Sequence, residues 1–385
     1  MPTLTNNAMF EIEREKDFSP ENTLGFLRKR ENFITLSEGI KRELKRLGYD
    51  GDDKQLFAHF NSVLEKAGFT YDDCRNAPKW FGNKVKPSPK YAIRLCFAFG
   101  LSGKAALDFL WKACKVNGFN FRRAEDVVCC YGLENGKSYA ETVELIKRYK
   151  THTAELSFEE SDATKRTYTL RAVFNELKGM DEAVFFEKLC ANKKNFIKYS
   201  KTAHEEFVRL YENLKETIRE EIANHQNDHK YTAMEKYDSE PSVYPEIVYA
   251  FGKISAAAKS NKTKGSTFAH LAENFPQGKY LNSMFNIPSE ATDKEYDKAR
   301  KAFILLYFAD YTLDPPPDGF YDDFYIALNT MLDKCGYAKL YPANPYDWLI
   351  LNCVKSLDVN DQTEDLNPVE LFNEVLELLA DESNR

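Results

Sequence analysis

Apolar residues recur every three or four positions along most of this chain, and that spacing is typical of amphipathic helices. One such stripe covers residues 34–47 and another covers residues 56–67. Gly48 and Gly68 follow these stripes directly. Glycine in that place favours a helix end, because it adopts the left-handed terminal conformation without strain. The strict alternation of apolar and polar residues that marks strands is rare, so the sequence predicts an all-α fold.

The helical pattern continues beyond Gly68. Pro78 must bend or end the next helix, because proline removes a backbone donor from a helix interior. Pro89, in contrast, suits the first turn of the helix that follows it. Helices are therefore expected over residues 70–81, 89–99, 102–116, 124–133 and 139–149.

Composition divides the 385 residues into segments. A chain of this length can form two or three domains, each with its own core. We expect a helix-turn-helix-like domain, a Ser/Thr/Glu-rich linker, a helical segment with a long charged helix and a C-terminal helical domain, over residues 1–150, 151–167, 168–240 and 241–385.

The sequence also indicates the cellular compartment. No apolar run approaches the ~20 residues needed to cross a bilayer, and residues 1–17 lack the apolar core of a signal peptide. The eight cysteines have neither the spacing of a zinc site nor that of a disulfide framework. We therefore expect a cytoplasmic protein, without membrane contact, whose cysteines are reduced and mostly in the core.

The net charge of −7 is unevenly distributed. Residues 1–150 carry 26 Lys+Arg and 20 Asp+Glu, a net charge of +6, whereas the remaining residues carry 27 and 40, a net charge of −13. A basic front and an acidic back favour different partners, because charge patches attract the opposite sign. The front suits a polyanion, and the acidic back suits a basic protein.

A Gly/Asn/Lys/Pro loop at residues 80–89 lies between two apolar-periodic segments. It fits the loop that follows the second helix of a helix-turn-helix. Residues 74–107 hold no Asp or Glu. The predicted second helix begins near Asp72 and Asp73, two carboxylates that a duplex would repel. The candidates for phosphate contacts here are Arg75, Lys79, Lys84, Lys86, Lys90 and Arg94.

Residues 266–287 form a second candidate helix-turn-helix, with a short helix, a turn and another short helix. Upstream of it, residues 247–272 hold no Asp or Glu within an otherwise acidic half. A solvated Lys/Ser/Asn loop is an alternative interpretation of this basic island. The candidate DNA contacts in this region are Lys259, Lys262, Lys264, Lys279 and Asn282.

Residues 87–91 (Pro-Ser-Pro-Lys-Tyr), the apolar run 92–101 and the helix 105–114 resemble the λ-repressor-like helix-turn-helix domain. The wider chain is similar to helix-turn-helix-containing proteins of Firmicutes, often linked to mobile elements. The matching parts are residues 84–149, 275–308 and 341–351. The resemblance implies an N-terminal helix-turn-helix bundle followed by a larger helical C-terminal region. It also implies a role in regulation or in maintenance of a mobile element.

Catalytic motifs are absent from the sequence: it contains no glycine-rich phosphate loop, no GxSxG and no HExxH. We therefore expect a protein that is not an enzyme and that has no cofactor and no metal site. His225 and His229 are four residues apart, but their polar surroundings favour a solvated pair. Arg219 and His225 loosely match the spacing of a class of dimerising helical ribonucleases, and this match is kept as a remote alternative.

Two further patterns have structural interpretations. Asn344, Pro345 and Asp347 suit the N-cap, first position and first turn of a helix. A group of aromatic residues could stack on single strands, but their helical spacing favours a place in the core. These residues are Tyr307, Phe308, Tyr311, Phe320, Tyr321, Phe324 and Tyr325.

Taken together, these patterns lead to the hypothesis of a DNA-binding regulator of transcription, of helix-turn-helix type, that contacts duplex DNA through its basic front. A homodimer is one state that such a regulator could adopt. The alternative is an adaptor or inhibitor that binds a protein partner through its acidic helical half.

Overall fold

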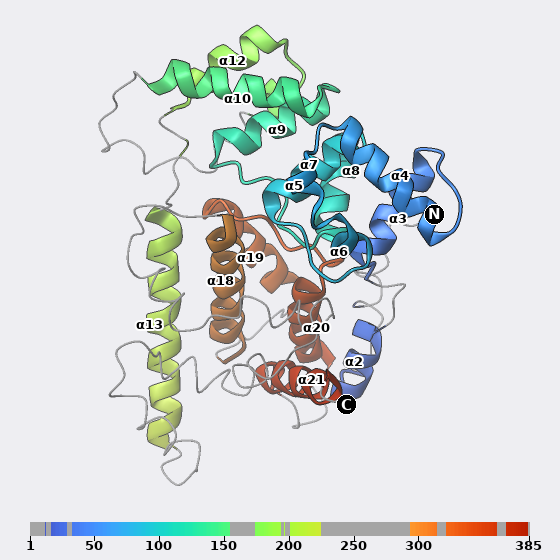
Figure 1. The fold of residues 1–385 in the computed structure, drawn as a ribbon. Coiled ribbons are helices and arrows are strands. Elements are labelled where there is room, and N and C mark those ends of the chain that lie inside the picture. Colours follow the sequence, from blue (N-terminus) through green and yellow to red (C-terminus); the bar gives the residue numbers. More distant parts are fainter. Residues whose placement is uncertain are drawn as a thin grey trace. The chain divides into compact units, whose positions relative to one another are not determined.

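The structure is a computed structural model, and all of its regular elements in the described part of the chain are helices (Figure 1). The all-α prediction is therefore confirmed. In the same part of the chain, no helix combines the length and the apolar character that crossing a membrane requires. The residues that the structure describes are Ile12, 17–28, 33–154, 174–193, Phe196, 201–224, 293–313, 321–359 and 367–383.

The chain folds into two compact units. Unit 1 comprises residues 1–33, 201–332 and 339–385, and unit 2 comprises residues 34–200 and 333–338. The helices of unit 1 are α2 (Pro20–Arg28), α13 (Lys201–Asn224), α18 (Asp293–Leu313), most of α19 (Tyr321–Lys334), α20 (Pro345–Val359) and α21 (Pro368–Ser383). The helices of unit 2 are α3 (Leu36–Arg46), α4 (Asp53–Lys66), α5 (Tyr71–Cys74), α6 (Ala77–Phe81), α7 (Pro89–Ala98), α8 (Gly103–Asp108), η1 (Phe109–Ala113), α9 (Ala124–Glu134), α10 (Tyr139–Ala154) and α12 (Glu182–Ala191).

The first helices of unit 2 begin at capping boxes. In each, the N-cap side chain accepts from the N–H three residues later, and the side chain of that later residue accepts from the N-cap N–H. The pairs are Thr35 with Glu38, Asp52 with Gln55, and Thr70 with Asp73. Gly48 and Gly68 follow the ends of α3 and α4 at φ +86° and +75°, in the left-handed region that glycine enters without strain. The helix ends predicted at these glycines are confirmed.

An aromatic cluster holds unit 2 together. Phe60 of α4 stacks on Phe99 with ring centroids 6.1 Å apart, and Trp80 of α6 contacts Tyr91 of α7 at 5.4 Å. Trp80 is 1% exposed, and the Phe60 and Phe99 side chains are fully buried. Each such ring removes a large apolar surface from water. The cluster therefore fixes α4, α6 and α7 against one another.

Two predicted helices, one of them with a bend or an end expected at Pro78, are each divided in the structure. Residues 70–81 form α5 and α6, and Pro78 lies in the first turn of α6, where its missing N–H costs nothing. Residues 102–116 form α8 followed by the π-helical turn η1. A π turn adds one residue to a helical turn and is frequent at functional sites. Apolar spacing did not indicate it.

Unit 1 joins the two ends of the described chain. The Phe26 ring of α2 stacks on Trp348 of α20, with centroids 4.2 Å apart. The Asn352 amide donates to the Thr23 hydroxyl at 3.1 Å, and both residues are buried. Helix α2 also packs against α21. The N-terminal helix is thus part of the C-terminal core.

A buried ion pair links α18 to α20. The Arg300 guanidinium donates to both carboxylate oxygens of Asp347, at 3.0 and 2.7 Å, and also to the Lys339 carbonyl at 2.9 Å. The side chains of this pair are 1% and 0% exposed. The Asn344 side chain accepts from the Tyr346 N–H at 2.9 Å, which confirms the predicted N-cap of α20. The aromatic group predicted to be core is buried at Phe308, Tyr321 and Phe324.

Several predictions concern residues outside the described part. Helix α10 extends to Ala154, into the segment expected as a linker, and residues 155–167 lie outside the description. The second candidate helix-turn-helix at residues 266–287 also lies outside it, as does Phe320. The four predicted segments stay predictions.

Candidate nucleic-acid interface

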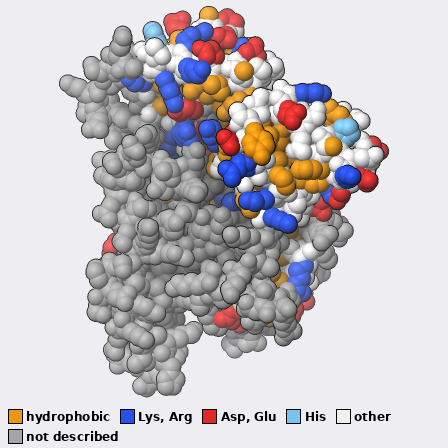
Figure 2. All heavy atoms as spheres, viewed as in Figure 1, with side chains coloured by type: hydrophobic (Ala, Val, Ile, Leu, Met, Phe, Trp, Pro, Cys, Tyr) orange, Lys and Arg blue, Asp and Glu red, His pale blue; other side chains and the backbone are white. Residues whose placement is uncertain are grey.

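The basic residues predicted for the first candidate site belong to α5, α6, the loop after α6 and the start of α7. Arg75, Lys79, Lys84 and Lys90 are exposed, and Lys86 is half-buried. In Figure 2, Lys and Arg side chains lie beside exposed hydrophobic side chains over α5 and α6. We call Arg75, Lys79, Lys84, Lys86 and Lys90 the basic surface of unit 2.

Asp73 anchors α5 to α7. Its carboxylate accepts a hydrogen bond from the Arg94 guanidinium at 2.8 Å and one from the Tyr91 hydroxyl at 3.0 Å. It also accepts from the backbone N–H of Thr70 at 2.9 Å, as part of the capping box. The carboxylate has four donors, counting the Thr70 hydroxyl at 2.9 Å, and the two from α7 hold the short helix α5 against that helix.

The electrostatics of Asp73 follow from these donors. Burial raises the pKa of its carboxyl group, but the hydrogen bonds from Thr70, Arg94 and Tyr91 outweigh burial and hold the pKa well below its usual range. The pKa of Tyr91 is raised, mainly by its hydrogen bond to Asp73 and to a lesser degree by burial. Asp73 therefore stays charged and is balanced by Arg94. The predicted pair of repelling carboxylates is reduced to one exposed group, Asp72.

Arg94 is a correction to the predicted set of phosphate contacts. It is 8% exposed, and its guanidinium also donates to the Gly68 carbonyl at 2.6 Å. The guanidinium carbon lies 4.0 Å from the Phe69 ring centroid and 4.8 Å from that of Tyr139. A group held by a carboxylate, a carbonyl and two rings is not free to bind a phosphate. Arg94 is a structural residue.

The loop that carries Lys84 and Lys86 is held at its start. The Lys84 N–H donates to the Lys79 carbonyl at 2.7 Å. Asn83, at φ +54°, accepts from the Leu36 N–H at 3.2 Å through its side chain. Asparagine is among the residues that tolerate this left-handed conformation best. These bonds, with the buried Trp80 and Phe81, fix the start of the loop.

The other predicted site residues cannot be placed. Lys259, Lys262, Lys264, Lys279 and Asn282 lie outside the described residues. The same holds for His225 and for the side chain of Arg219, the basis of the ribonuclease alternative.

Within the described residues, no group of three His, Cys, Asp or Glu could hold a metal ion. Seven of the eight cysteines are buried thiols and Cys74 is half-buried, so their predicted place in the core is confirmed.

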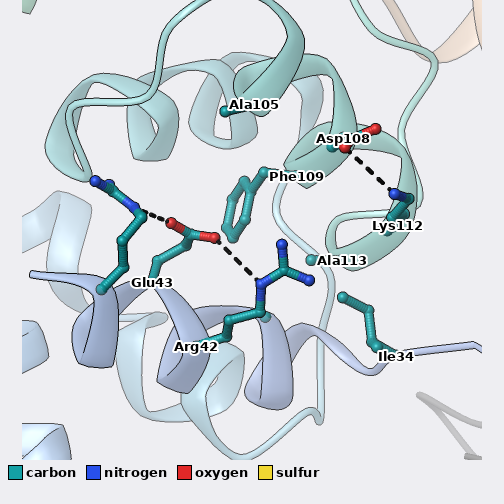
Figure 3. A pocket seen from close by; sticks show the side chains of 10 residues that line it. Ile34, Arg42, Glu43, Ala105, Asp108, Phe109, Lys112 and Ala113 are labelled. Carbon is teal, nitrogen blue, oxygen red and sulfur yellow. Dashed lines mark hydrogen bonds and ion pairs between the residues drawn. The ribbon is translucent and has the colours of Figure 1, made fainter. Parts of the chain in front are cut away.

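A small hollow with both apolar and charged residues in its lining lies between α3 and the α8–η1 segment, with a volume of about 120 Å³. Figure 3 shows Arg42 and Glu43 of α3 on one side, and Asp108, Phe109 and Lys112 on the other. Glu43 accepts from Arg46 at 2.6 Å, and Lys112 pairs with Asp108 at 3.3 Å. Most of its charges are thus already paired within the chain.

A close helix contact forms the floor of this hollow. A Cβ at Gly39 would collide with the Cβ of Ala113, so only glycine permits this approach of α3 to η1. Because the charged side chains of the hollow pair with one another, it is a weaker candidate for ligand binding than the basic surface.

Sequence reasoning missed two features of the interface. The first is the pairing of Asp73 with Arg94, twenty-one residues later. The Thr70-x-x-Asp73 spacing was a local signal, because it indicates a capping box that turns the carboxylate towards the helix start. The second is the exposure of Tyr71, which is 88% exposed at the first position of α5. No local signal indicated it.

No family model, no curated protein and no solved structure matches this chain. The resemblance to λ-repressor-like helix-turn-helix proteins stays a prediction. The functional argument therefore depends on the chemistry of the basic surface and on the contacts that hold it.

Proposed function

We propose that this protein is a non-enzymatic DNA-binding regulator that contacts the phosphate backbone through the basic surface of unit 2. The observation that carries the proposal is the succession of Arg75, Lys79, Lys84, Lys86 and Lys90 along two short helices, the loop that follows them and the first turn of α7. Lysine and arginine on one face bind phosphates by releasing condensed counterions. Such binding needs neither a cofactor nor a catalytic group.

The electrostatic surroundings support this proposal. The stretch from residue 74 to residue 107 has no carboxylate in its sequence. Asp73, the nearest acid on the N-terminal side, is balanced by the Arg94 guanidinium at 2.8 Å. A stretch that carries several cations and no carboxylate favours contact with a polyanion.

The rigid support of the surface favours binding as well. Side chains that are already positioned lose less conformational freedom when they bind. Trp80 and Tyr91 pack together beneath the surface, and Asn83 attaches the loop to α3. The order of α4, a turn, and then α5 and α6 fits the helix-turn-helix arrangement that we propose for this region.

The proposal is tested by titrating the full chain with duplex DNA at several salt concentrations. Replacing Lys84, Lys86 and Lys90 together by glutamine should weaken binding. It should also lower the slope of log affinity against log salt by roughly two to three, because about 0.9 is lost per phosphate contact. The measurement is fluorescence anisotropy of a labelled duplex.

A matched control replaces three exposed lysines elsewhere in unit 2, Lys45, Lys54 and Lys66, by glutamine. This variant has the same change in net charge but keeps the basic surface. If both triple variants lose the same affinity, the effect is one of net charge, and the proposed surface is wrong. Affinity of the parent chain that does not depend on salt contradicts the proposal altogether.

A further inference from the structure

Tyr71 is the most exposed large hydrophobic side chain in the described part of the chain. It is 88% exposed, compared with 63% for Ile326 and about 40% for the next ones. Tyrosine rings normally bury a large area, because their apolar surface is costly to leave in water. An aromatic ring left in solvent on a rigid helix suits contact with a flat partner.

The Tyr71 ring takes no part in the polar or aromatic contacts of the described residues. Within the described residues, no aromatic ring stacks on it, no cation lies over it, and its hydroxyl makes no hydrogen bond. Its backbone, however, is fixed by the Thr70–Asp73 capping box at the start of α5. The ring is therefore presented by an ordered element and remains available.

Two exposed basic residues, Arg75 and Lys90, belong to the region around Tyr71. Arg75 is four residues later, and residues so spaced lie on the same face of a helix or of its next turn. The Tyr91–Asp73 hydrogen bond brings the start of α7 against α5, so that Lys90 belongs to the same region. Asp72 is the exposed acid next to the ring. The region combines an aromatic platform with phosphate-binding cations, the combination that single-strand binding requires.

The lengths of α5 and α6 argue for the same class of ligand. They contain four and five residues, and at 1.5 Å per residue each extends about 6–8 Å. Such short helices present few side chains to the base edges of a major groove. A stacked base, in contrast, needs only one ring and nearby cations.

We propose that Tyr71 stacks on an unpaired base, and that the basic surface binds DNA at single-stranded segments. This inference rests on the proposed function, because Arg75 and Lys90 would hold the phosphates on either side of the stacked base. The basic surface would then prefer DNA with unpaired bases over a fully paired duplex.

The experiment compares two probes of equal length, oligo-dT and a duplex, with the full chain and two variants. Tyr71→Ala should bind oligo-dT about 5- to 150-fold more weakly, the range that loss of one base stack produces. Its affinity for the duplex should stay within about twofold. Tyr71→Phe should keep the affinity for oligo-dT, because the ring, not the hydroxyl, makes the stack.

The salt dependence separates stacking from charge. Tyr71→Ala should shift the affinity for oligo-dT at every salt concentration and leave the slope unchanged, since no phosphate contact is lost. Leu47→Ala, another exposed apolar residue of unit 2, is the control and should bind like the parent chain. Circular dichroism should show unchanged folding, because the Tyr71 side chain is 88% exposed and buries little surface.

Each remaining outcome overturns the inference in a recognisable way. If the parent chain binds neither probe, the proposed function fails and this inference fails with it. If the parent binds DNA and Tyr71→Ala binds as tightly, only the stacking role is wrong. An equal loss on duplex and oligo-dT would likewise show that Tyr71 does not distinguish unpaired bases.

Discussion

At the scale of single residues, the structure assigns different roles to side chains of the same type. Lys90 and Arg94 are four residues apart on α7, but Lys90 is exposed, whereas Arg94 is buried against Asp73. Asp72 and Asp73 differ in the same manner. Residues four apart lie on the same face of a helix, so the difference comes from what packs against each turn. Arg94 contacts Asp73 and the Phe69 ring, whereas Lys90 in the first turn of α7 is exposed. Charge alone therefore did not indicate which residues could bind a phosphate.

Asp73→Asn should destabilise unit 2 by about 2 kcal/mol, because it removes a charged acceptor from Arg94 and leaves that cation partly unpaired. The pKa of Asp73 is lowered in the folded chain, so its stabilising contribution is present above the ordinary carboxyl pKa and is lost as the pH falls. Urea unfolding of parent and variant should therefore differ most at neutral pH and converge in acid. A constant difference at all pH values would contradict this assignment.

At the scale of elements, side chains within one turn decide where the helices of unit 2 begin. Burial in the tertiary structure decides how much an acidic residue at such a start costs. Asp126 lies in the first turn of α9 and accepts from the Asn120 N–H at 2.8 Å. Burial raises the pKa of its carboxyl group to about 6, although the positive charge of Arg123 and the bond from Asn120 act in the opposite direction. A first-turn acid is normally favourable. Here its burial makes the charged form costly.

The sign of the resulting pH dependence is fixed by that shift. Because the folded pKa lies above the unfolded value of 3.8, the stabilising contribution is complete below about pH 4 and is lost as the pH rises through about 6. Asp126→Asn keeps an acceptor for Asn120 and cannot ionise. In the parent chain the unfolding free energy should fall by up to about 3 kcal/mol as the pH rises through this range. The variant should not show this fall. Denaturant titrations at pH 4, 5, 6 and 7 measure it, and parallel pH profiles for parent and variant would refute the role of Asp126.

At the scale of the whole molecule, each unit is assembled from segments that are distant in the chain. Unit 1 brings α2 together with α20 and α21 through the Phe26–Trp348 stack and the Thr23–Asn352 bond. Unit 2 includes residues 333–338 beside residues 34–200, and Tyr337 lies 5.0 Å from the Arg122 guanidinium. Composition along the sequence reveals segments, but it cannot reveal such returns of the chain.

The Arg300–Asp347 pair is expected to be the main polar link within unit 1. Asp347→Ala should lower the unfolding free energy by about 3–5 kcal/mol, because it leaves the Arg300 cation buried without its counter-ion. Arg300→Leu combined with Asp347→Leu should cost less than the sum of the single changes, since no uncompensated charge remains. Thermal unfolding of the singles and the double provides the measurement. Additive effects would show that the two charges do not depend on each other.

The fold class and many helix ends were predictable because they depend on interactions within one turn. Apolar spacing predicted α3 and α4, glycine predicted their ends, and Asn344 with Pro345 predicted the start of α20. Three of the predicted lysines, Lys79, Lys84 and Lys90, are exposed, and their contact with phosphates stays a prediction. The inward position of Arg94 was not predictable, because it depends on α5 lying beside α7.

The sequence by itself determined that this chain forms helices, where several of them begin and end, and where positive charge accumulates. Those properties depend on side chains three or four residues apart, which meet in any helix. Only the tertiary structure decided that Asp73 is balanced by Arg94, that Asp347 is buried with Arg300, and that Tyr71 is left in solvent. Those facts depend on which helix faces come together, because packing brings residues 21 and 47 positions apart into contact.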